Sequence, residues 1–386
     1  MEHSFTVRGK TIGGGRIFMT AEIGYAPMGN INYAKTMIRA AADAGCDGCD
    51  MFSCSHGRNF AFSQFSDTRP GEGIPAYYEH VRKLQFTFEE WQELFRYADE
   101  CGVILYQTPL DVDAVRMADR LGVPMVNINS DDINNPLLLR AVAELGVPVT
   151  MHDINATLSD VESAVMTLRG YGVKNLVVLH STQESGDEDT LFASANLEVI
   201  NTYRQAFGGL GVLAGCVEHT SSDFLIYTVA AFRPAVLSKH IYIDVPDRNV
   251  PDAPCSVNVE YYAAMVKKLR YSEMALGVGN NQLLVSLYNG VENTDRYKRR
   301  KVLVAARDIP AGKVIDENDI MAKRPGHFGG LSGWNARIII GATARTDIAF
   351  DTILSFNHFE NFPDQDYKFP ELQKVIVKDI NNARNA

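Results

Sequence analysis

The chain has 386 residues, of which 46% are hydrophobic and 22% charged, and this balance is typical of a folded protein and excludes a disordered one. The net charge of −10, without a long basic run, argues against a nucleic-acid-binding protein, and no stretch approaches the roughly 20 apolar residues of a membrane span. The first residues lack the layout of a secretory signal, so we expect a soluble, cytoplasmic protein.

Short apolar runs of β type alternate with amphipathic helical segments over most of the chain. The predicted strands are 16–24, 47–53, 102–109, 123–130, 147–153, 175–181, 211–219 and 235–244. Apolar residues at helical spacing predict helices at 31–45, 87–102, 111–122 and 157–172, each ending in glycine. Eight strand-then-helix units favour a closed parallel (β/α)8 barrel of the TIM type. The alternative, a doubly wound open sheet, usually has a GxGxxG phosphate loop after its first strand, and this chain does not.

The pattern changes after a last helical stretch at 259–277. From Lys301 on, short β-prone runs are broken by Pro-Gly and Gly-Gly turns, which predicts a small, mainly-β domain. We therefore expect a barrel at 1–285, a linker at 286–300 and a second domain at 301–386. Within that domain 306–320 and 344–359 look weakly alike, which hints at a folded-over duplication.

Polar residues gather at the carboxyl ends of the predicted strands, where TIM barrels carry their active sites. They are Glu22, Asp50, Ser53, Gln107, Thr108, Asn127, Asn129, Ser130, His152, Asp153, His180, Ser181, Glu218, His219, Lys239 and His240. For any single one of them a structural role is the commoner one. His219 and His240, however, end neighbouring strands, which lie about 4.8 Å apart. Two such imidazoles can share a divalent ion or act as acid and base, and the residues alone leave both roles open.

An ordered series of motifs resembles the sialic acid synthase family. The motifs are AEIG, TPLD, LGVP, LLLRAVAELGVPV, EHT and KH, followed by VAARDIPAGKVIDENDIMAKRPG in the second domain. The resemblance covers nearly the whole chain and implies a (β/α)8 barrel joined to a C-terminal antifreeze-like (SAF) domain. It also implies the family's reaction, in which the alkene carbon of phosphoenolpyruvate attacks the open-chain aldehyde of a metal-bound N-acyl amino sugar. The products are a keto acid and phosphate.

Carried over to this chain, the resemblance implies a role for four residues of the first domain. His219 and His240 match the ligands of a divalent metal ion, for which manganese, magnesium or another first-row metal is expected. Glu22 and Asp252 match the family's acidic catalytic residues. The chemistry of these side chains agrees, since a divalent ion polarises an aldehyde oxygen and a carboxylate moves protons.

Three further residues match the family's substrate-binding positions. Thr108 and Ser130 match positions of the donor pocket. Arg324 matches an arginine that the second domain of the partner subunit inserts over the acyl group of the sugar. This match implies a homodimer with exchanged C-terminal domains.

The chain departs from the family where the family binds phosphoenolpyruvate. Asp50 and Asn127 stand at two lysines that grip the donor's phosphate and carboxylate, Gln183 stands at an asparagine, and His152 stands at a serine. An aspartate in place of a lysine changes the local charge by two units and repels an anionic donor. These four are candidate substrate-binding residues, with Lys239 as the remaining cation of the site.

Three functions are compatible with this pattern. The first is a metal-dependent carbon–carbon bond-forming synthase that condenses an enolpyruvyl or other enolate donor with an aldehyde or N-acyl amino sugar, giving a sugar acid. The second keeps the metal but acts as a lyase, isomerase or hydratase on a small hydroxy or keto acid, with Asp50, Asp153 and Glu218 as new acids and bases. The third is a non-catalytic sugar- or metal-binding paralogue. All three predict small-molecule ligands and neither nucleic-acid nor membrane partners.

Overall fold

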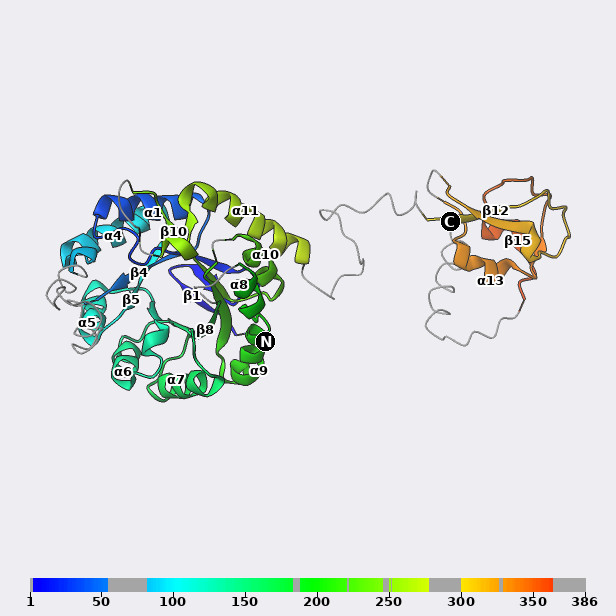
Figure 1. Cartoon of the computed structure of the whole chain (residues 1–386). Coiled ribbons are helices and arrows are strands. Elements are labelled where there is room, and N and C mark those ends of the chain that lie inside the picture. The colour runs from blue at the N-terminus through cyan, green and yellow to red at the C-terminus, as the bar shows by residue number, and fades with distance from the viewer. Residues whose placement is uncertain are drawn as a thin grey trace. The chain divides into compact units, whose positions relative to one another are not determined.

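The computed structural model describes residues 3–54, 82–182, 188–220, 222–245, 250, 252–277, 300–325 and 329–363. The chain divides into two units, Met1–Gly279 and Asn280–Ala386, which Figure 1 shows with their elements. The linker predicted at 286–300 falls almost wholly outside the described residues, so the predicted domain bounds stay a prediction.

Eight parallel strands of the first unit close into a barrel. In chain order they are β3 (Phe18–Glu22), β4 (Gly48–Ser53), β5 (Ile104–Pro109), β6 (Val126–Ile128), β7 (Val149–His152), β8 (Leu176–Ser181), β9 (Leu213–Glu218) and β10 (Val236–Tyr242). Each pairs with the next, and β10 also pairs with β3, which closes the ring. A short strand, β11 (Val257–Asn258), is added to β10. The predicted barrel and its eight strands are confirmed.

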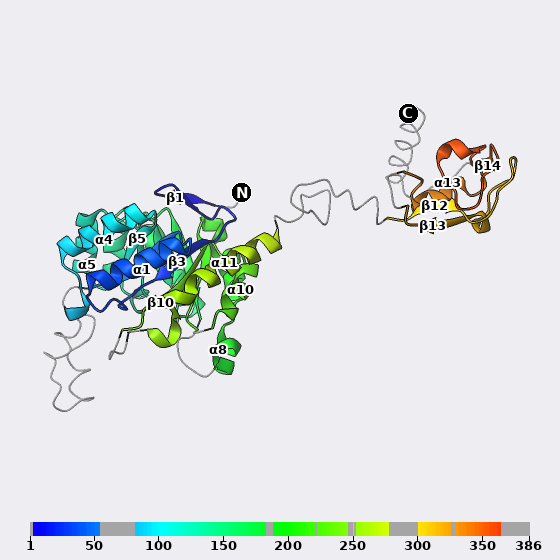
Figure 2. The same cartoon turned by 90° about the horizontal axis from the view of Figure 1, so that it is seen from above.

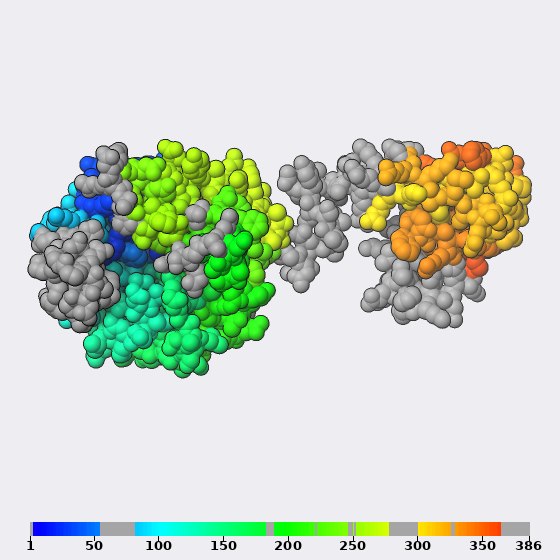
Figure 3. Space-filling model, in the orientation of Figure 1, coloured from blue at the N-terminus to red at the C-terminus, as the bar shows by residue number. Residues whose placement is uncertain are grey.

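Helices surround this barrel (Figures 1 and 2). They are α1 (Ile31–Asp43), α4 (Phe88–Cys101), α5 (Val112–Leu121), α6 (Pro136–Glu144), α7 (Leu158–Gly170), α8 (Glu188–Ser194), α9 (Val199–Phe207), α10 (Phe224–Ala231) and α11 (Val259–Leu276). Outside the parts drawn in grey, the space-filling view shows the first unit as a closely packed surface on the face that is drawn (Figure 3). Within the described ranges, no helix is both long and apolar enough to cross a bilayer.

Local sequence signals explain where these helices begin and end. Helix α4 starts at Thr87, whose hydroxyl accepts from the backbone N–H of Glu90 while the Glu90 carboxylate accepts from that of Thr87. It ends at Gly102, whose φ of 75° is a left-handed conformation that favours glycine. Short 3-10 turns, η1 (Ser130–Asp132), η2 (Gly208–Leu210) and η3 (Ala253–Cys255), shape three of the connections.

Strand alternation sorts the side chains of the barrel into two layers. On β10, Val236 belongs to the apolar cluster inside the barrel, whereas Leu237 packs in the layer between strands and helices. The same alternation places Ser238 and His240 inside and Lys239 outside. At the amino-terminal end, a hairpin of β1 (Phe5–Val7) and β2 (Lys10–Ile12) adds its apolar residues to the inner cluster. The polar ends of the strands therefore lie at the opposite end, which we call the mouth.

The second unit is small and contains short antiparallel strand pairs, as predicted. Its strands are β12 (Val302–Ala305) with β13 (Ile320–Lys323), and β14 (Thr343–Ala344) with β15 (Phe359–Glu360). Helix α13 (Ala336–Ile339) and the turns η4 (Glu317–Asp319), η5 (Gly333–Asn335) and η6 (Phe356–His358) complete it.

Reciprocal hydrogen bonds join the two weakly similar segments of the second unit. Ile309 and Ile348 exchange backbone hydrogen bonds of 2.8 Å each. The Asp308 carboxylate accepts from the Phe350 N–H at 2.7 Å, and the Asp347 carboxylate accepts from the Ala311 N–H at 2.8 Å. Equivalent residues thus make equivalent contacts, which is the arrangement expected of a folded-over duplication.

Candidate functional site

Three buried side chains from neighbouring strands meet at the mouth. Glu22 ends β3, His240 lies directly opposite it on β10, and His219 follows β9. The His240 Nε2 and Glu22 Oε1 atoms are 3.3 Å apart, and the two imidazole centroids are 5.1 Å apart. One ligand atom of each residue lies within 4.8 Å of those of the other two. This three-residue group is a candidate metal centre.

Surrounding groups orient two of these side chains. The Nδ1 atom of His219 lies 3.1 Å from the Thr182 carbonyl oxygen, so Nδ1 carries the proton and Nε2 keeps its lone pair. The Thr182 hydroxyl accepts from the backbone N–H of His219 at 2.8 Å. Ser238 donates to Oε2 of Glu22 at 3.1 Å. Partners of this kind hold a ligand in one orientation before a metal binds.

Burial keeps the histidines of the mouth neutral. Desolvation lowers the pKa of His219 to about 3 and that of His240 well below its ordinary value. Desolvation also lowers the pKa of His152, to about 4. Neutral imidazole is the form that ligates metals. Two neutral imidazoles and a carboxylate therefore fit a first-row divalent ion.

A chain of hydrogen bonds runs along the wall of the mouth from β7 to β4. The Thr150 hydroxyl donates to Asn127 Oδ1 at 2.7 Å, Asn127 Nδ2 donates to the Thr108 hydroxyl at 2.9 Å, and that hydroxyl donates to Asp50 Oδ2 at 2.7 Å. All four residues are buried. We call them the β4–β7 wall. Asp50, Thr108 and Asn127, three of the predicted substrate-binding residues, are thus brought together.

The last residue of this chain has an unused oxygen. Asp50 Oδ1 is buried and has no hydrogen-bond partner within the described part of the chain. Desolvation raises the pKa of Asp50 from 3.8 to about 7, against the opposing effect of the Thr108 hydrogen bond. The carboxyl group therefore titrates near neutral pH.

Asp252 and Ser130 lie in the connections that follow two barrel strands, Asp252 after β10 and Ser130 after β6. Asp252 has a φ of 60°, and its Oδ2 lies 3.4 Å from where a Cβ on Gly24 would stand, so the carboxyl group is beside the turn that follows Glu22. Desolvation raises its pKa. Ser130 is buried at the start of η1, directly beyond β6, and its hydroxyl donates to Asn129 Oδ1 at 3.3 Å.

The structure corrects the expectation for Lys239, which is not a free cation of the site. Its side chain faces away from the lumen and is completely buried. Its Nζ donates to Glu218 Oε2 at 2.6 Å, and also to the carbonyl oxygens of Thr220 and Cys255. Glu218 and Lys239 are register partners on the outer face of β9 and β10, so both are used structurally.

Asp153, another predicted acid or base, is also fully engaged. Its carboxylate accepts from the Ser181 N–H at 2.6 Å and the Tyr203 hydroxyl at 2.5 Å, and it lies 3.1 Å from Nδ1 of His180. Burial alone would lower the pKa of His180, but hydrogen bonding to Asp153 and its negative charge raise it. Through these hydrogen bonds, Asp153 joins β8 of the barrel to Tyr203 of α9. Of the three acids proposed for an altered reaction, only Asp50 lies in the mouth.

Two predicted residues do not belong to the described part of the first unit. Gln183 lies outside the described residues. Arg324 lies in the second unit, directly after β13, with an exposed side chain.

Three residues that shape the site were not predicted from the sequence: Thr150, Thr182 and Ser238. Period-two alternation could have found two of them, because Ser238 and Thr150 each stand two residues before a histidine predicted to face the lumen. Nothing comparable marks Thr182, whose contacts depend on how β8 and β9 are aligned.

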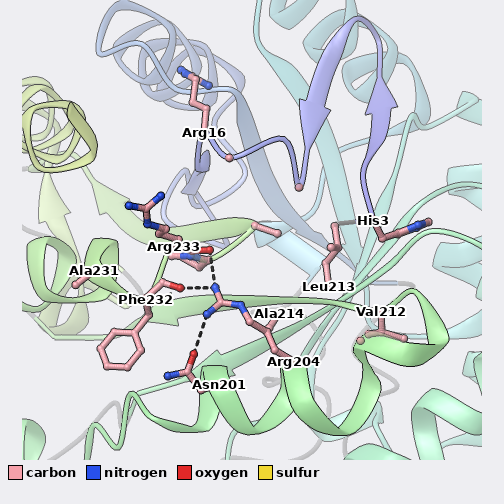
Figure 4. Close-up of a pocket in the computed structure, with 15 residues that line it drawn as sticks. His3, Arg16, Asn201, Arg204, Val212, Leu213, Ala214, Ala231, Phe232 and Arg233 are labelled. Atoms are coloured by element: carbon pink, nitrogen blue, oxygen red, sulfur yellow. Dashed lines mark hydrogen bonds between the residues drawn. The ribbon is translucent and has the colours of Figure 1, made fainter. Parts of the chain in front are cut away.

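A separate cavity of about 590 Å³ lies at the opposite end of the barrel, by the amino-terminal ends of β9 and β10 (Figure 4). Its central Arg204 donates to Asn201 Oδ1 at 2.9 Å and to the carbonyl oxygens of Phe232 and Arg233. These contacts join α9, which precedes β9, to the segment that precedes β10. Because TIM barrels carry their chemistry at the other end, this cavity is not part of the candidate site.

Comparisons with known proteins agree with this architecture. The NeuB family model matches residues 37–281 and the SAF domain model matches 300–360. The chain is 26% identical over 347 residues to N,N'-diacetyllegionaminic acid synthase of Campylobacter jejuni, covering 88% of this chain and 99% of that one. It is 29% identical over 312 residues to mouse N-acetylneuraminate-9-phosphate synthase, covering 80% and 83%.

A solved structure shows the same fold. The N-acetylneuraminic acid synthetase of Leptospira borgpetersenii superposes with a TM-score of 0.63 at 23% identity, covering 74% of this chain and 94% of that one. The barrel, the second unit and the family match, which extends over more than half of the sequence, lead to one conclusion. The chain belongs to the NeuB family, the sialic acid synthase family that its motifs resemble, and joins a (β/α)8 barrel to a SAF domain.

Proposed function

We propose that this NeuB-family synthase is metal-dependent and joins an enolate donor to the aldehyde carbon of a sugar-like acceptor, giving a sugar acid. The observation that carries the proposal is the buried group of Glu22, His219 and His240 at the mouth. Relatives that match most of the chain are named N,N'-diacetyllegionaminic acid synthase and N-acetylneuraminate-9-phosphate synthase, and both names refer to sugar acids. They support the same class of product here.

His219 and His240 would hold the ion through neutral imidazole nitrogens, with Glu22 beside them. A bound divalent ion would act as a Lewis acid on the acceptor's carbonyl oxygen. Glu22 keeps one oxygen on Ser238 and the other near His240, so its charge is fixed at the reacting centre. Asp252, with its raised pKa, retains a proton more readily than an exposed aspartate and can deliver it at the rim.

The remaining family roles are part of the same proposal. Thr108 and Ser130 would contact the donor, and His152 lies on β7 near enough to lower the pKa of both candidate ligands. Arg324 of the partner subunit would grip the acceptor's acyl oxygen, since a guanidinium presents several N–H donors in one plane. This role requires a homodimer with exchanged C-terminal domains.

Metal stoichiometry tests the proposal without knowledge of the substrates. Purified full-length protein, dialysed against Mn²⁺ and then against buffer, should retain about one ion per chain by elemental analysis. The double variant His219→Ala, His240→Ala should retain less than a tenth of that amount. His3→Ala, which removes an exposed histidine of the same unit, is the control and should bind like the wild type. Full retention by the double variant would refute the proposed centre.

A further inference from the structure

We infer that the β4–β7 wall (Asp50, Thr108, Asn127 and Thr150) binds an uncharged, hydroxyl-bearing end of the substrate and rejects a phosphate. The inference deepens the proposed function and rests on it for the position of the reacting centre. It concerns the part of the mouth that lies beside the candidate metal centre, because Asp50 on β4 is the register partner of Glu22 on β3.

The direction of the hydrogen bonds decides what the wall can still accept. Asn127 is held by both ends of its amide, because Oδ1 accepts from Thr150 and Nδ2 donates to Thr108. The Thr108 proton is then directed to Asp50. Each proton in this chain points towards the carboxyl group. What remains for a ligand at the end of the chain, when the Asp50 carboxyl group is ionised, is its Oδ1, an acceptor that has no hydrogen-bond partner among the described residues.

A buried acceptor without a partner is unfavourable, so a ligand that donates a hydrogen bond to it gains affinity. Hydroxyl groups of a ligand can donate this hydrogen bond, whereas phosphate and carboxylate oxygens place negative charge against Oδ1. The inward-facing side chains described at the ends of β4 to β7 include no lysine or arginine that could offset such a charge. The wall therefore disfavours an anionic substrate end.

Charge balance favours a hydroxyl over an ammonium group, which could also donate. A divalent ion at the proposed centre would balance the two carboxylates of Glu22 and Asp50. An uncharged polyol or hydroxyketone leaves that balance intact, while an ammonium or a phosphate dianion disturbs it. The neutral hydroxyl and amide groups of Thr108, Asn127 and Thr150 are also typical partners of sugar hydroxyls.

Asp50→Asn is the decisive variant because it keeps the shape of the side chain and reverses its polarity. Its amide oxygen can still accept from Thr108, while an N–H donor replaces the unpartnered oxygen. In manganese-loaded full-length protein, proton line broadening measures binding of dihydroxyacetone and calorimetry measures binding of phosphoenolpyruvate. Asp43→Asn makes the same change on an exposed face of α1 and is the control.

The wild type and Asp43→Asn should broaden the dihydroxyacetone signals, and Asp50→Asn should reduce the broadening at least fivefold. Phosphoenolpyruvate should bind Asp50→Asn at least tenfold more tightly than the wild type. Equal or tighter binding of phosphoenolpyruvate by the wild type, or absence of dihydroxyacetone broadening by it, would overturn the inference. Manganese content is measured first: if it is absent the proposed function fails, and if it is present a failure concerns the wall alone.

Discussion

At the scale of single residues, the mouth contains two buried carboxyl groups with different surroundings. Glu22 receives the Ser238 hydroxyl and lies against His240, so its negative charge has partners. Asp50 accepts from Thr108 through Oδ2, while its Oδ1 has no hydrogen-bond partner in the described ranges, and burial raises its pKa to about 7. One carboxyl group thus has hydrogen-bonding and histidine neighbours at the candidate metal centre, while the other changes charge near neutral pH.

The titration of Asp50 predicts a pH-dependent difference in stability between the wild type and Asp50→Asn. The unfolded chain ionises Asp50 near 3.8, and the folded chain near 7. The unfolded state therefore binds fewer protons between these values, and the wild type loses stability as the pH rises through that range. At about 1.4 kcal/mol per pH unit, Asp50→Asn should gain about 2–3 kcal/mol relative to the wild type between pH 5 and pH 8.

Denaturant unfolding of metal-free protein at several pH values measures this gain. Asp43→Asn should show no comparable trend, because its side chain is largely exposed in both states. If the wild type and Asp50→Asn changed in parallel over this range, the raised pKa of Asp50 would be wrong.

At the scale of elements, the ends of β9 and β10 carry the two candidate metal ligands on one face and a buried ion pair on the other. Lys239 and Glu218 are completely buried, and the lysine also bonds the carbonyl oxygens of Thr220 and Cys255 beyond the strands. Since His219 and His240 adjoin these residues in the chain, the ion pair fixes the strand ends from which they project.

Breaking this pair should destabilise the barrel strongly. Lys239→Met leaves the Glu218 carboxylate buried without its cation, and removal of one partner of a buried pair costs about 3–5 kcal/mol. The double variant Glu218→Leu, Lys239→Met should recover at least half of the loss, because no uncompensated charge is then left. Denaturant unfolding measures both. A single variant within 1 kcal/mol of the wild type would contradict the structural role of the pair.

The elements show what the sequence could and could not predict. Apolar runs identified all eight barrel strands, because each is an almost wholly buried segment and several of the helices between them have clear caps. The β1–β2 hairpin was missed because each of its strands has only three residues. The role of Lys239 was mistaken because a lysine next to a histidine reads as part of a site, whereas strand alternation turns the two in opposite directions. The β4–β7 wall depends on side chains from four strands, and sequence spacing does not fix their contacts.

At the scale of the whole molecule, the candidate metal centre and the predicted acyl-binding arginine belong to different units. Glu22, His219 and His240 all lie in Met1–Gly279, which has its own apolar cores, whereas Arg324 lies in Asn280–Ala386. Metal binding should therefore be separable from both the second unit and the dimer.

A chain that ends at residue 279 tests this separation. It should still bind about one Mn²⁺ per chain, because every candidate ligand and every described orienting group is retained. Full-length protein should have twice the chain mass of 42.7 kDa by light scattering if the units are exchanged between subunits. Arg324→Ala in the full chain should keep both the dimer mass and the metal while weakening binding of an N-acyl amino sugar by about tenfold or more, since a charge-assisted hydrogen bond contributes about 1.5–3 kcal/mol. If the shortened chain folded by circular dichroism but lost the metal, the centre would need groups from the second unit, and the assignment of its ligands to the barrel alone would be wrong.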